Sequence, residues 1–101
     1  MPQYRILYWQ DIPSVVEASH GRKRHKEQLS SRFQELIDTV AMRKGLFGTD
    51  EYLEAWSKGE TCPAEGDVVD IAKNIAAELE SRYEQIECAS LAQAAKSSNN
   101  G

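Results

Sequence analysis

The 101-residue sequence contains only two cysteines, Cys62 and Cys88, and they lie far apart in the chain. Without a closely spaced pair, the sequence has no Cys-x-x-Cys signature of a zinc or redox site. We predict two unpaired thiols, because disulfides are rare in the cytosol. A disulfide between the loop that holds Cys62 and the helix that holds Cys88 is the alternative, and its geometry cannot be judged from sequence.

Long hydrophobic runs and an excess of basic residues are also missing. No stretch approaches about eighteen consecutive apolar residues, so no membrane-spanning helix is predicted. The first residues lack the pattern of a secretory signal, and we expect a cytoplasmic protein. The chain has 12 Lys+Arg against 16 Asp+Glu, a formal net charge of -4. This balance argues against binding to nucleic acid or to an anionic membrane.

Two β-strands are predicted near the start of the sequence. Residues 4–9 are aromatic and aliphatic without helical spacing, and residues 14–19 form a shorter strand. Between them, Asp11 favours a turn and Pro13 cannot donate a backbone hydrogen bond to a sheet. We therefore expect a β-hairpin. Strand alternation places Arg5, Leu7 and Trp9 on one face and Tyr4, Ile6 and Tyr8 on the other.

Three helices are predicted after this hairpin. The first spans residues 31–44 and carries an apolar stripe at helical spacing. The second, a short one, spans residues 49–58. The third and longest starts after Asp67 and continues beyond residue 86, because no Gly or Pro interrupts its apolar pattern.

Polar residues mark the starts of these helices. Ser31 and Gln34 fit a capping box, in which the serine hydroxyl accepts a hydrogen bond from a free backbone N–H group. Thr49 and Asp67 are predicted as N-caps of the second and third helices.

Together these elements predict an α+β fold, with an N-terminal two-stranded β-hairpin packed on three helices, the last one long. Residues 1–90 are expected to form a single domain, and residues 91–101 a fraying helix end and a disordered tail. Two strands alone are marginal in water, and a chain of this size has a modest core. An exposed strand edge or apolar face could therefore pair with a second copy of the chain as a homodimer.

One dense basic segment stands out, and it contains Arg22, Lys23, Arg24 and Lys26. It could dock an acidic protein surface or another anion. Alternatively, it is a solvated segment that leads into the first helix. It holds one glycine and no aromatic residue, so it resembles neither a phosphate-binding loop nor a single-strand nucleic-acid site.

The predicted hairpin turn is the second candidate for a binding surface. Trp9 and Asp11 could contact a partner there, since tryptophan often anchors protein interfaces. The alternative is that Trp9 fills the core and Asp11 closes the turn.

No catalytic or metal-binding set is visible in the sequence. His20 and His25 are not spaced to share one face of a helix or a strand, and zinc needs three or four converging ligands. The acidic residues of the last predicted helix fit a solvated helix face, and they are Glu78, Glu80, Glu84 and Glu87. We therefore expect a protein that is not an enzyme and that carries no metal or cofactor.

Several short motifs in combination resemble the bacterial virulence factor domain family, also found within a staphylococcal conserved virulence factor. The resemblance spans roughly residues 4–83. It implies a bacterial origin and names no catalytic residue, and Gln10 stands where an arginine is expected. The motifs are residues 6–13, Gly21-Arg22-Lys23, Leu29, Arg32-Phe33, Ile37-Asp38, Ala41-Met42-Arg43, Gly48-Thr49-Asp50, and Tyr52-Leu53 with Trp56.

We interpret the chain as a small non-enzymatic interaction or regulatory module. It is expected to dock a protein partner through Trp9 and Asp11 of the hairpin turn and through the basic segment. These two segments follow consecutive parts of one hairpin, so we expect them to lie near each other. The alternative is a small-ligand accessory protein that holds a phosphate or carboxylate cofactor. The resemblance supports this alternative, because it implies company with one-carbon metabolic enzymes.

Overall fold

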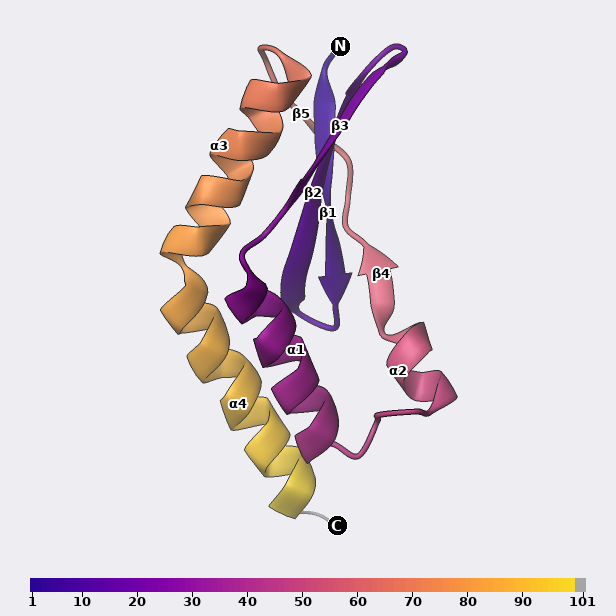
Figure 1. Ribbon diagram of the computed structural model, residues 1–101, viewed down its shortest axis with the longest axis vertical. Coiled ribbons are helices and arrows are strands. Elements are labelled where there is room, and N and C mark those ends of the chain that lie inside the picture. Colours follow the sequence, from indigo (N-terminus) through magenta and orange to yellow (C-terminus); the bar gives the residue numbers. More distant parts are fainter. Residues whose placement is uncertain (100–101) are drawn as a thin grey trace.

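A computed structural model describes residues 1–99 of the chain, and side chains are described through residue 94. The molecule is elongated, with extents of 47 × 27 × 19 Å. The two C-terminal helices, drawn orange to yellow, run along one long side, and the strands lie beside the first of them (Figure 1). The elements are β1 (Gln3–Trp9), β2 (Ile12–His20), β3 (Lys23–Gln28), α1 (Ser31–Arg43), α2 (Asp50–Glu54), β4 (Trp56–Lys58), β5 (Cys62–Pro63), α3 (Val68–Ser81) and α4 (Tyr83–Asn99).

The strands form one antiparallel sheet in the order β3-β2-β1-β4, and β5 pairs with β1 beside β4. The β1–β2 register is regular from Gln3 to Leu7. It then shifts by one residue. Leu7 pairs with Val15 and Tyr8 pairs with Pro13, so Ser14 has no partner in β1. The extra residue in β2 is a β-bulge, which bends the strand at the end nearest the turn.

The α+β class is confirmed, but the predicted two-stranded hairpin is too small. Three of the four residues of the basic segment, Lys23, Arg24 and Lys26, lie in strand β3, which pairs with β2 along its whole length. Residues 56–58, expected at the end of a helix, form β4 against β1. The described residues therefore contain five strands. Strand β3 carries almost no apolar residue, so the hydrophobic pattern that identifies strands is absent from it.

The helix count also differs from the prediction, because the expected long C-terminal helix is two helices. Arg82 has φ -101° and ψ 7° and separates α3 from α4, although no Gly or Pro stands there. The break lets α4 pack along α1, where the Tyr83 ring meets the edge of Phe33 at 5.1 Å between ring centroids. The described residues contain four helices.

Two of the predicted caps are confirmed and one is wrong. Asp67 accepts a hydrogen bond from the Val69 N–H group at the start of α3, and Thr49 caps α2. Ser31 is the first residue of α1 rather than its cap, and the cap residue Ser30 makes no side-chain cap bond within the helix. The carboxylate of Glu80 on α3 binds this end of α1 instead.

Glu80 is the centre of a polar cluster that joins the start of α1 to the end of α3. Its carboxylate accepts hydrogen bonds from the Ser30 N–H group at 2.7 Å and from the Ser30 hydroxyl at 2.8 Å. The Arg32 guanidinium donates to the same carboxylate at 2.9 and 3.1 Å and lies 4.3 Å from the Tyr83 ring centroid. Partial burial raises the pKa of Glu80, but these hydrogen bonds and the Arg32 charge outweigh it and hold the pKa below its ordinary value.

The core lies between the sheet and the helices, and α3 packs across β2 and β3. Val16 and Ala18 of β2 are buried there, together with Phe33 and Ile37 of α1. Alternate residues of β2 therefore face the helices, and the residues between them face away from α3.

The predicted fraying end and disordered tail at residues 91–101 stay a prediction. Helix α4 continues to Asn99, and residues 100 and 101 lie outside the described part of the chain. Among the described helices, none is long and apolar enough to cross a bilayer.

Candidate functional site

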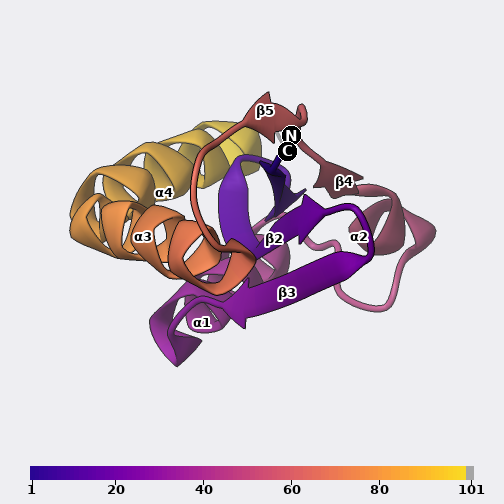
Figure 2. The ribbon, with the colours of Figure 1, turned by 90° about the horizontal axis from the view of Figure 1, so that it is seen from above.

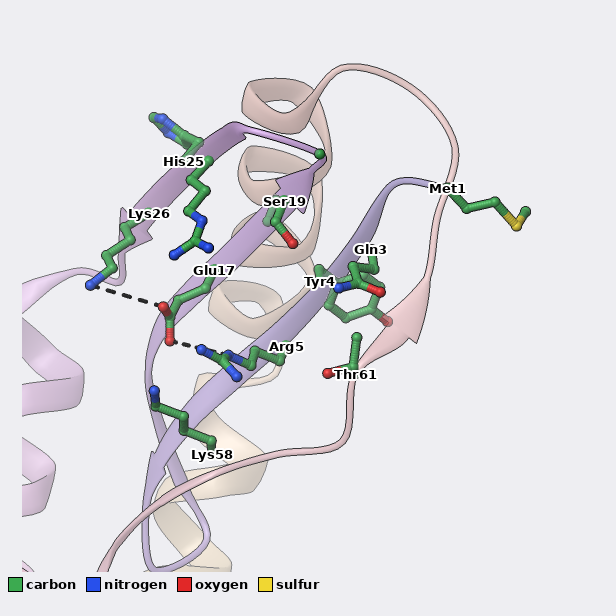
Figure 3. A pocket seen from close by; sticks show the side chains of 13 residues that line it. Met1, Gln3, Tyr4, Arg5, Glu17, Ser19, His25, Lys26, Lys58 and Thr61 are labelled. Carbon is green, nitrogen blue, oxygen red and sulfur yellow. Dashed lines mark ion pairs between the residues drawn. The ribbon is translucent and has the colours of Figure 1, made fainter.

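The face of the sheet that is turned away from α3 carries a row of charged side chains. The strand register places Arg5, Glu17 and Lys26 opposite one another on three neighbouring strands. In the next row of the same face, Arg24 lies beside Ser19. Figure 3 views this face, with Arg5, Glu17 and Lys26 in front of the strands.

These side chains surround a shallow, open concavity of about 480 Å³. Four cations line it, one from each of β1 and β4 and two from β3, against a single carboxylate. Lys58 belongs to this face because it pairs with Leu7, which has the same alternation as Arg5. The charged lining residues, apart from His25, are Arg5, Arg24, Lys26, Lys58 and Glu17. We call these five residues the cationic face.

Glu17 is held between two of the cations. Its carboxylate lies 3.6 Å from Arg5 Nε and 3.9 Å from Lys26 Nζ. The Lys26 side chain is 74% exposed, so this pair is well screened by water and contributes little to stability. The face keeps a surplus of positive charge, since one carboxylate offsets only one of the four cations. It can therefore attract an anion.

The structure separates the two segments that were predicted to dock one partner together. Asp11 lies in the β1–β2 turn, whereas Arg22 lies in the β2–β3 turn. These turns are at opposite ends of β2 (Figure 1), a nine-residue strand that spans about 30 Å. The prediction that they lie near each other is wrong, because consecutive turns of an antiparallel meander lie at opposite ends of the strands.

Trp9 is placed in the core rather than on a surface. Its side chain is fully buried, its Nε1–H group donates to the Tyr52 carbonyl oxygen at 2.9 Å, and the Tyr52 ring packs 5.5 Å away. The ring therefore presents no surface to a partner, and of the two interpretations of Trp9 the structure favours the core.

The basic segment divides among three positions. Arg24 and Lys26 line the concavity, whereas Lys23 has the opposite alternation on β3 and Arg22 occupies the turn. Sequence reasoning missed Arg5 and Lys58 as members of the site. Strand alternation placed Arg5 on one face of its strand with Leu7 and Trp9, but nothing in the sequence connected it to the basic segment.

The described residues contain no group of three or more metal-ligating side chains. His25 pairs with Glu27 at 3.0 Å, and both are half-buried on the other side of β3. Cys62 and Cys88 are free thiols, as predicted.

A second, smaller hollow lies on β1 beside the chain that links β4 to β5. It has a volume of about 350 Å³, and Tyr4, Tyr8, Gly59 and Cys62 are among its lining residues. Burial and the neighbouring Cys62 raise the pKa of both tyrosines above 10.0. Both phenols are therefore protonated at neutral pH, where they can donate hydrogen bonds.

The geometry defines a small α+β domain with an open cationic sheet face. The chain belongs to the family described as "Virulence factor", whose family model matches residues 7–92. The match confirms the resemblance seen in the sequence. It extends from β1 into α4, so it includes all of the cationic face except Arg5. No curated protein and no solved structure matches the chain.

Proposed function

We propose that this protein is a non-enzymatic interaction module that docks an acidic surface of a partner protein on the cationic face. The observation that carries the proposal is the gathering of four cations around one carboxylate on an uncovered sheet face. This gathering occurs in a chain whose net charge is -4. Clustered charge of one sign raises both the rate and the specificity of association with a complementary surface.

The shape and lining of the concavity favour a protein over a small molecule. Small-ligand sites are usually enclosed and mainly apolar, with few polar groups. This concavity is open, and most of its lining is charged or polar. A long polyanion such as a nucleic acid is disfavoured, because outside the cationic face the chain carries a larger negative charge than its total of -4.

One feature of the lining supports a binding role rather than catalysis. Among the described lining residues, Glu17 supplies the only carboxylate, and that carboxylate is already paired with cations. Glu17 already faces Arg5 and Lys26. A general base normally needs a free carboxylate or imidazole within reach of a substrate proton.

The test compares two double charge reversals that change the net charge equally. In the first, Arg24→Glu and Lys26→Glu alter the cationic face. In the control, Arg43→Glu and Lys73→Glu alter exposed positions on α1 and α3. A native bacterial lysate is passed over each immobilised protein and over the wild type, at low and at physiological salt.

We expect proteins that the wild type and the control retain and that the first variant loses. Their retention should fall as salt rises, because charges on an open face are screened within about 8 Å at physiological ionic strength. Equal retention by all three proteins would overturn the proposal.

A second candidate function is the binding of a small phosphate or carboxylate compound. The observation in its favour is that the concavity, about 480 Å³, is large enough for such a molecule. Thermal unfolding in a panel of phosphorylated and carboxylated metabolites tests it, since a ligand of the folded state raises the midpoint. A rise that disappears in the Arg24→Glu, Lys26→Glu variant would favour this candidate.

A further inference from the structure

Strand β3 forms one of the two edges of the sheet, and β4 and β5 form the other. It is the first strand in the order β3-β2-β1-β4, and its pairing partner is β2 alone. Figure 2 shows β3 at the border of the sheet. An edge strand presents unpaired backbone groups that can accept a further strand.

The register identifies which backbone groups of β3 point outward. The Leu29 N–H group donates to the Ser14 carbonyl oxygen at 3.0 Å, continuing the β2–β3 ladder. In an antiparallel ladder, hydrogen-bonded and non-hydrogen-bonded pairs alternate. His25 and Glu27 therefore share the inward orientation of Leu29, whereas the N–H and C=O groups of the residues between them point away from β2. These outward residues are Arg24, Lys26 and Gln28.

The side chains of the same three residues are exposed, and those of Arg24 and Lys26 lie on the cationic face. Within the described residues, no hydrogen bond engages their outward backbone groups. The edge of β3 therefore offers unpaired backbone N–H and C=O groups beside the cationic side chains of Arg24 and Lys26. An added strand would bring every second residue of its own beside Arg24 and Lys26, because side chains alternate between faces.

Charge decides which chain can fill this edge. If a second copy paired antiparallel through β3, the residues that face away from α3 in one copy would lie opposite the residues that face away from α3 in the other. Pairing centred on His25 would set Arg24 against Lys26, and pairing centred on Lys26 would set that residue against its own copy. Like charges directly opposite each other destabilise a sheet. A segment with carboxylates at alternate positions makes attractive pairs instead.

We propose that the edge of β3 receives an extended acidic segment of a partner protein as an additional strand, with carboxylates at alternate positions beside Arg24 and Lys26. This inference rests on the proposed function and adds the mode of recognition to it. Backbone hydrogen bonds along an edge give affinity in such strand addition, and alternate side chains give specificity.

The test uses a short blocked peptide that alternates glutamate with valine as the probe. A control peptide has the same composition but groups its glutamates together. Gln28→Pro removes one outward N–H group without changing charge, and proline is tolerated at an edge where that group faces solvent. Gln28→Ala is the matched control, because it loses the same side chain and keeps the N–H group.

We expect the alternating peptide to bind the wild type and Gln28→Ala alike, and Gln28→Pro at least tenfold more weakly. Hydrogen exchange of the wild-type Arg24, Lys26 and Gln28 amides should slow when the peptide binds. The control peptide should bind more weakly than the alternating one. The exchange measurement keeps the test decisive if Gln28→Pro does not fold.

Unchanged exchange at these three amides, or equal affinity of folded Gln28→Pro and Gln28→Ala, would overturn strand addition. In that case the proposed function stands only if Arg24→Glu with Lys26→Glu still abolishes peptide binding. Binding that this double variant leaves unaltered would overturn both.

Discussion

Substitution of Glu80 tests how strongly its carboxylate joins the end of α3 to the start of α1. The carboxylate accepts two hydrogen bonds from Ser30 and two from Arg32. Hydrogen bonds to a charged group contribute roughly 1.5–3 kcal/mol when solvent is excluded. Here the Glu80 and Arg32 side chains are 29% and 44% exposed, so the arginine pair is screened and adds little. We expect Glu80→Ala to lower the free energy of unfolding by about 2 kcal/mol.

Thermal and urea unfolding followed by circular dichroism measure this loss. For a domain of this size, about 2 kcal/mol corresponds to a fall of about 10 °C in Tm. Glu84→Ala is the matched control, because Glu84 is an exposed carboxylate in the first turn of α4. A change below about 0.5 kcal/mol in Glu80→Ala would refute the claim that this carboxylate caps α1.

The same cluster predicts how stability depends on pH. The folded protein holds the pKa of Glu80 below its ordinary value of 4.5. Its stabilising contribution is therefore complete above pH 4.5, and it disappears as the pH falls through the lower pKa of the folded state. The stability difference between the wild type and Glu80→Gln should shrink over that acidic range. A difference that stays constant to the lowest pH at which both proteins fold would contradict the assignment.

Three further predictions concern the core, the second hollow and the cationic face. Trp9→Ala should lower the free energy of unfolding by about 3–5 kcal/mol in urea titrations, because a fully buried ring is lost; a near-neutral result would refute its place in the core. Gly59→Ala should cost roughly 1–3 kcal/mol in the same assay, because the new Cβ would lie 2.9 Å from Tyr8 Cε2; an unchanged midpoint would contradict this contact. Glu17→Gln should change stability by less than about 1 kcal/mol and tighten binding of an acidic peptide about two- to fivefold, measured by fluorescence anisotropy; weaker binding would count against the cationic face.

The sequence predicted the elements that have local signals. Helix α1 and the caps at Thr49 and Asp67 follow from apolar spacing and from short-range hydrogen bonds. Strand β1 follows from its β-branched, aliphatic and aromatic residues. In each case the residues that determine the structure lie within a few positions of one another.

The elements that the sequence missed depend on distant partners. Strand β3 is highly polar, because its outer edge and one face are solvated. Its identity comes from the ladder that β2 provides. The cap of α1 comes from Glu80, about fifty residues along the chain. Neither relationship leaves a periodic signal in the sequence.

The candidate site was only partly predictable for the same reason. Arg24 and Lys26 were predicted because they belong to one dense basic segment. Arg5 and Lys58 are isolated in the sequence, and only the pairing of β1 with β2 and β4 brings them to the same face. Trp9 could be assigned to a core or to a surface until α2 was seen to cover it.

The central claim is that the cationic face is where the protein binds an acidic partner. The most direct measurement is a titration of the ¹⁵N-labelled protein with an acidic peptide, followed by amide chemical shifts. We predict that the amide shifts change mainly on the cationic face and that the shifts of α3 and α4 stay unchanged. The residues of this face are Arg5, Glu17, Arg24, Lys26 and Lys58. Shifts that scatter over the surface, or that gather on the helices, would contradict the claim.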